Sequence, residues 1–127
     1  MAIKFKLVER KNPQDLTAPP KYYAKAVVKG KRTLRTLAER IAANSTMGIG
    51  DIYGVLLNLE QEIDYGLEDG DAVELGRICI FSPVVQSEGV TDSSEFNTGT
   101  HVKRKSVNIR ARRNFAQKIN NVPLERD

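Results

Sequence analysis

Residues 50–76 carry the sequence GDIYGVLLNLEQEIDYGLEDGDAVELG, which decides the fold. The apolar residues that recur at helical spacing, and so predict a helix over residues 50–65, are Ile52, Leu56, Leu59 and Ile63. From residue 52 to residue 59, only Gly54 and Asn58 are not apolar. A helix that is apolar around most of its circumference must be buried on more than one side. One short neighbouring helix cannot provide that cover, so we expect a homodimer.

The segments around this helix predict a helix pair followed by an antiparallel sheet. In chain order we expect a helix at residues 34–44, strands at 72–75, 78–85 and 102–111, and a short helix at 112–120. Thr33 is a typical N-cap for the first helix. Residues 87–100 are polar and predict a loop or flexible arm around Phe96. The spacing of Phe115 and Ile119 directs both side chains inward from the last helix.

An additional hairpin is expected before the helices. Apolar residues alternate with lysines over residues 3–10, and a second strand-like stretch covers residues 22–29. A proline-rich connection at residues 11–20 joins the two strands. The predicted fold class is therefore α+β, with an N-terminal β-hairpin, a two-helix hairpin, a three-stranded antiparallel sheet with an arm, and a short C-terminal helix. The expected units are residues 1–32, 33–120 and a tail at 121–127.

Charge is distributed in three blocks along the chain. Residues 1–35 hold ten Lys/Arg and two acids, residues 36–98 hold two Lys/Arg and twelve acids, and residues 99–118 hold seven Lys/Arg and no acid. The formal net charge of +4 therefore conceals two concentrated basic segments. Clustered cations attract polyanions, among which DNA is the most common in a cell.

The C-terminal basic segment is the candidate DNA-binding site. Its candidate phosphate contacts are Lys103, Arg104, Lys105, Arg110, Arg112 and Arg113. Alternation along a strand directs residues 103 and 105 one way and residue 104 the other. The alternative is a solvated strand end whose charges only aid solubility. For the N-terminal basic residues, we favour the solvent face of a small sheet over a second phosphate-contacting surface.

Other kinds of site find little support in the sequence. Cys79 is the only cysteine and lies in an apolar run, so we expect a small buried residue, no disulfide, and a reducing compartment such as the cytoplasm. His101 is the only histidine, so neither a zinc site nor a histidine-based triad is expected. No apolar run approaches the roughly 20 residues that span a bilayer. We therefore expect no enzyme activity, cofactor, metal, small-molecule substrate or membrane partner.

The order and spacing of these elements resemble the bacterial HU/IHF family of histone-like DNA-binding proteins, in its N-terminally extended branch. The matching segments are Thr33–Asn44, Gly50–Tyr65, Gly70–Gly76, Ile78–Phe81 and Val107–Ile119. The resemblance implies an intertwined homodimer that acts as an architectural, nucleoid-associated protein. It would bind and condense double-stranded DNA in the cytoplasm through phosphate contacts, with weak sequence preference.

The chain also departs from the family's pattern. Cys79 occupies a family glycine position, and Ala111-Arg112 replaces a Pro-Gly pair. Family members carry a proline at the arm tip that wedges between base pairs, but no proline lies between Val84 and Asn121 here. The arm also contains acids at residues 88, 92 and 95. These departures favour an alternative, a protein-interaction module that does not bind DNA and keeps an HU-like dimer scaffold.

Overall fold

The computed structural model describes all of residues 1–127 and has two β-sheets and a helix pair. In chain order, the elements are β1 (Ile3–Arg10), β2 (Lys21–Ala26), α1 (Leu34–Ala43), α2 (Ile49–Glu68), β3 (Val73–Leu75), β4 (Cys79–Ser87), the 3-10 helix η1 (Ser93–Glu95), α3 (Thr98–His101), β5 (Val102–Ala111), α4 (Arg113–Asn120) and β6 (Leu124–Arg126). The α+β class and the order of the principal elements are as predicted. None of the helices is both long enough and apolar enough to cross a lipid bilayer.

The helix pair begins and turns as the sequence predicts. The Thr33 hydroxyl accepts a hydrogen bond from the backbone N–H of Thr36 (3.2 Å), which caps α1. Helix α2 is longer than expected and contacts α1, β3 and β4. Gly66 permits the approach of α2 to β3, because a Cβ atom built there would lie 2.7 Å from Cγ2 of Val73.

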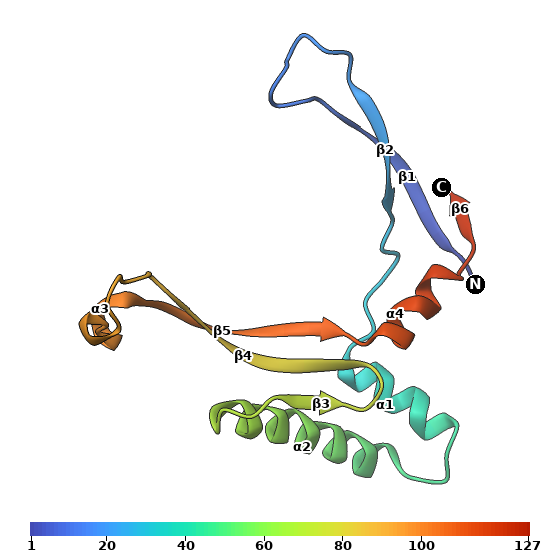
Figure 1. The fold of residues 1–127 in the computed structure, drawn as a ribbon. Helices are drawn as coiled ribbons and strands as arrows, with labels where there is room; N and C mark the ends of the chain where they lie inside the picture. The colour runs from blue at the N-terminus through green and yellow to red at the C-terminus, as the bar shows by residue number, and fades with distance from the viewer.

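The second sheet has the strand order β3–β4–β5 and is antiparallel throughout. The short strand β3 pairs only with residues 79–81 of β4, and Gly76, with φ of +52°, lies in the turn between them. Beyond Phe81, strands β4 and β5 continue as a two-stranded ribbon away from the helices (Figure 1). Residues 82–87 of β4 span about 20 Å in this ribbon. The segment predicted as a loop or arm, residues 87–100, lies at the end of the ribbon, and we call the ribbon and this end together the arm.

The end of the arm differs from the expected loop, because it is folded. It contains η1 and α3, whose first turns are capped by the side chains of Asp92 and Asn97. The backbone N–H of Asn97 also donates to Nδ1 of His101 (2.8 Å), and the rings of His101 and Phe96 lie 5.3 Å apart. Local hydrogen bonds that the Asp92 and Asn97 side chains accept from backbone N–H groups therefore order a segment whose composition predicted flexibility.

The N-terminal hairpin belongs to a three-stranded sheet with the order β2–β1–β6. Strands β1 and β2 pair antiparallel, as predicted, but residues 121–127 are not a free tail. Their strand β6 pairs in parallel with β1, with Ile3 opposite Leu124. The two ends of the chain consequently lie close together in this sheet (Figure 1). In the hairpin loop, the side-chain hydroxyl of Thr17 donates to Asp15 (2.6 Å) and lowers the pKa of that carboxyl.

Very little of this chain is buried when it is considered alone. The buried residues are Ala38, Ile52 and Cys79, which confirms the expectation for the single cysteine. Phe115 and Ile119, which were predicted to point inward, are 45% and 60% exposed in the single chain. Together with Ala111 and Val122, they line an open apolar groove along α4.

Candidate nucleic-acid interface

The β3–β4–β5 sheet has one face toward α2 and one face away from it. Val73 contacts Gly66 of α2, and its cross-strand partner Phe81 lies on the same side. Because side chains alternate along a strand, the even-numbered residues of β4 and β5 occupy the opposite side. We call this side the outer face, and its residues are Glu74, Ile80, Ser82, Val84, Gln86, Arg104, Ser106, Asn108 and Arg110.

The structure separates the six predicted phosphate contacts into groups. Arg104 and Arg110 share the outer face, opposite Gln86 and Ile80. Lys105 is opposite Val85 and lies on the other face, as the alternation of residues 104 and 105 predicted. Lys103 falls at the register shift that follows Gln86.

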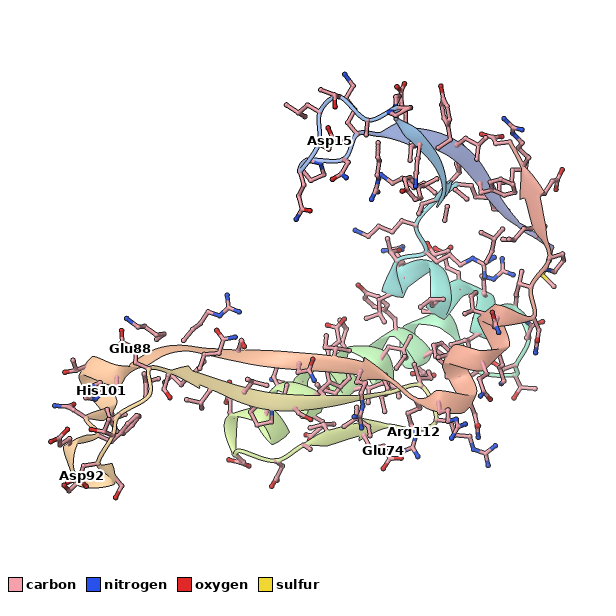
Figure 2. All side chains as sticks on the ribbon, turned by 45° about the horizontal axis from the view of Figure 1, so that its top comes forward. Asp15, Glu74, Glu88, Asp92, His101 and Arg112 are labelled. Atoms are coloured by element: carbon pink, nitrogen blue, oxygen red, sulfur yellow. The ribbon has the colours of Figure 1, made fainter.

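Two of the predicted cations form ion pairs with carboxylates of the same chain. Nζ of Lys103 lies 2.5 Å from Oε1 of Glu88, and the guanidinium of Arg112 contacts the carboxylate of Glu74 (Figure 2). All four side chains are at least 40% exposed. Exposed ion pairs contribute only about 0–1 kcal/mol, so a phosphate can replace either carboxylate at little cost.

Arginines gather where β5 turns into α4. A recess there is lined by Arg77, Arg112, Arg113 and Asn114, and an adjoining one by Ile80, Arg110, Ala111, Arg112 and Arg113. The backbone N–H of Arg112 donates to the carbonyl of Ile78 (2.9 Å), which fixes the corner. We call Arg77, Arg112, Arg113 and Asn114 the arginine recess.

Arg77 was not among the residues predicted from the sequence. It stands in the turn between β3 and β4 and is one of the two Lys/Arg in the acidic block of residues 36–98. The pairing of Cys79 with Ala111 places this turn beside the start of α4. The sequence signal for Arg77 was its position as an arginine within an acidic segment. Only the strand register shows that it lies beside Arg112.

The start of α4 adds a partial positive charge to this corner. Its N-cap residue, Arg112, makes no side-chain hydrogen bond to the first turn. The N–H groups of the first turn therefore have no capping side chain, and the helix dipole is positive at this end. Guanidinium groups and free backbone donors both favour anions, and guanidinium matches the geometry of phosphate oxygens. This corner can thus hold a phosphate group.

The arm tip has the opposite charge. Residues 88–101 contain Glu88, Asp92 and Glu95 but no lysine or arginine. Figure 2 shows Glu88, Asp92 and His101 at this end of the arm, far from Arg112. Cations therefore concentrate along the ribbon and at its base, whereas the tip is acidic.

Comparison with known proteins agrees with this arrangement of elements. No curated protein matches the chain. A solved structure from Bacteroides vulgatus, described as a "Putative bacterial DNA binding protein", is similar with a TM-score of 0.67 and 13% sequence identity. The similarity covers 98% of this chain and 47% of that one, so the chain spans about half the length of the solved relative. The family model described as "HU domain fused to wHTH, Ig, or Glycine-rich motif" matches residues 1–126, and the chain therefore belongs to this family.

Proposed function

We propose that this chain is a homodimeric architectural protein that binds duplex DNA through phosphate contacts. The observation that carries the proposal is the continuity of the outer face with the arginine recess. The cations along this path are Arg104, Arg110, Arg77, Arg112 and Arg113. The only acid on the outer face is Glu74, which pairs with Arg112. A protein with this function acts on DNA in the cytoplasm, without catalysis.

Weak sequence preference follows from the kind of surface that is offered. Affinity comes from the release of counterions as Lys and Arg neutralise phosphates, and this contribution is independent of sequence. Phosphate contacts fix the position of a protein on DNA, whereas base edges specify the sequence. The neutral polar residues of the outer face, such as Ser82 and Asn108, add hydrogen bonds to phosphate or sugar.

We propose a homodimer because a single chain exposes more surface than a folded monomer of its mass does. A folded monomer of this mass exposes about 6,800 Å², whereas this chain exposes 10995 Å². The excess is roughly 4,000 Å² per chain, or about 8,000 Å² for two chains, which is above the roughly 2,000–5,000 Å² that obligate interfaces commonly bury in total. Apolar side chains that a partner would cover include Val55 (59% exposed) and Ile109 (62% exposed). An isolated two-stranded ribbon is also marginally stable, so the arm needs a partner or DNA beside it.

The experiment that tests the function is duplex binding as a function of salt. If Arg77, Arg104, Arg110 and Arg113 of both subunits contact phosphates, these contacts alone contribute about −7 to the slope of log K against log[salt]. Fluorescence anisotropy of random-sequence duplexes between about 50 and 300 mM salt measures this slope. A protein that fails to bind at micromolar concentration and about 100 mM salt contradicts the proposal.

Removing the carboxylate of Glu88 is expected to strengthen binding to duplex DNA. In the Glu88→Gln variant, Lys103 loses its ion-pair partner and becomes free to contact phosphate. Because an exposed ion pair contributes up to about 1 kcal/mol, we expect affinity to rise by up to about fivefold. The same anisotropy assay measures this, with Glu60→Gln on α2 as the charge-matched control. Equal increases in the two variants would mean that only net charge matters.

A second candidate function is a protein-interaction module that uses the acidic arm tip. The observation in its favour is that Asp92 and Glu95 stand on a folded tip and form none of the ion pairs in the structure, whereas Glu88 pairs with Lys103. Phosphate is repelled by this tip, whereas a basic protein surface is attracted to it. Absence of duplex binding by the wild-type protein, combined with an intact dimer, would favour this second function.

A further inference from the structure

The N-terminal sheet has a face on which almost every polar side chain is cationic. Strand pairing places Lys6 opposite Lys25 and Arg10 opposite Lys21. With Lys4, these residues lie on one side of the sheet, since they are two or four residues apart along each strand. We call Lys4, Lys6, Arg10, Lys21 and Lys25 the cationic face. All five side chains are exposed.

This face carries charge that the chain does not neutralise. Like charges directly opposite each other on neighbouring strands destabilise a sheet, and the hairpin has two such pairs, which are separated on this face by Val8 and Tyr23. None of the ion pairs in the structure involves a residue of the cationic face. Glu125 of β6, opposite Lys4, is the acid that the strand pairing places on this side. An external polyanion would relieve the repulsion.

The cationic face ends in a recess at the hairpin loop. The recess is lined by Arg10, Lys11, Asn12, Pro13, Ala18, Pro19, Lys21 and Tyr23. The acid of this loop, Asp15, accepts hydrogen bonds from the backbone N–H and the hydroxyl of Thr17 (3.1 and 2.6 Å). It is not among the residues that line the recess. The recess is therefore lined by three cationic residues, Arg10, Lys11 and Lys21, and by no carboxylate.

We propose that the cationic face is a second binding surface for the phosphates of duplex DNA, separate from the outer face. This inference rests on the proposed function. From Lys4 to Arg10 the strand extends about 20 Å, with cations repeating in two neighbouring rows. That length corresponds to about six base pairs of B-DNA.

Charge and composition favour DNA over an acidic protein as the occupant. The cationic face has few apolar side chains besides Val8 and Tyr23. The centres of protein–protein interfaces are depleted in lysine and rich in apolar and aromatic residues. A duplex, by contrast, presents a regular line of charges that lysines can follow without burying apolar surface.

The test compares two full-length variants that lose the same charge. Lys6→Gln with Arg10→Gln removes two residues of the cationic face, whereas Lys29→Gln with Lys31→Gln removes two exposed lysines from the segment between β2 and α1. We expect the first variant to lower the salt slope by about 1.8 per chain and to weaken duplex binding at least about 50-fold at 0.1 M salt. The second variant should change both quantities much less.

Separate measurements distinguish a folding defect, and a failure of the proposed function, from a failure of this inference. Lys6→Gln and Arg10→Gln remove cross-strand repulsion, so the thermal midpoint should not fall. If wild-type protein binds DNA and the first variant keeps the wild-type slope, or if the two variants lose affinity equally, the inference is overturned while the proposed function stands. If the wild-type protein does not bind duplex DNA, the proposed function fails first.

Discussion

Replacing Arg104 and Arg110 by glutamate is expected to weaken duplex binding by about a thousandfold at 0.1 M salt. Both arginines lie on the outer face, and a homodimer presents each of them twice. Each phosphate contact that is lost lowers the salt slope by about 0.9, so the slope should fall by about 3.6. Fluorescence anisotropy across a salt series measures the affinity and the slope together.

The control for this variant is the neighbouring residue Lys105. It is opposite Val85 on the side of the sheet that contains Phe81 and faces α2. Lys105→Glu should therefore weaken binding much less than Arg104→Glu, although both reverse one positive charge on the same strand. Equal losses would contradict the assignment of DNA to the outer face and would leave only a general electrostatic attraction.

Introducing a charge at Val55 is expected to destroy the dimer. In a single chain Val55 is 59% exposed, so glutamate there would cost little if the protein were a monomer. If a partner covers it, an unpaired carboxylate is buried at a cost of several kcal/mol. We expect sedimentation of Val55→Glu to give the single-chain mass of 14.2 kDa, and its helical signal to melt at a lower temperature.

Gln61→Glu provides the matched control on the same helix. Gln61 is exposed and lies about 120° around the helix from Val55, because it is six residues away at 100° per residue. This variant should keep twice the single-chain mass and the wild-type melting temperature. A Val55→Glu variant that also remains dimeric and equally stable would refute the proposed interface.

Local patterns predicted most of the elements because the forces that determine them act over a few residues. Thr33 caps α1 as expected, since a side-chain hydroxyl and an N–H three residues later are close in any helix. The strand over residues 102–111 is found with the expected bounds. The stripe of Ile52 and Leu56 predicted α2, although its last turn continued to Glu68.

Features that depend on distant parts of the chain were not predictable in the same way. Nothing in the three residues of β6 indicates that they pair with β1, which lies more than a hundred residues earlier. The register of β4 against β5 places Arg110 on the outer face and Arg77 beside Arg112, and alternation alone cannot fix that register. The exposure of Phe115 and Ile119 reflects surface that one chain has no residues to cover.

Strand β6 also changes how the N-terminal sheet is attached to the rest of the molecule. The chain enters this sheet a second time through residues 121–123, in addition to the connection between β2 and α1. A body held by one linker can tumble in every direction, whereas one held at two points swings mainly about the line that joins them. The N-terminal sheet therefore loses less orientational entropy when it binds a ligand, and this lowers the free-energy cost of association.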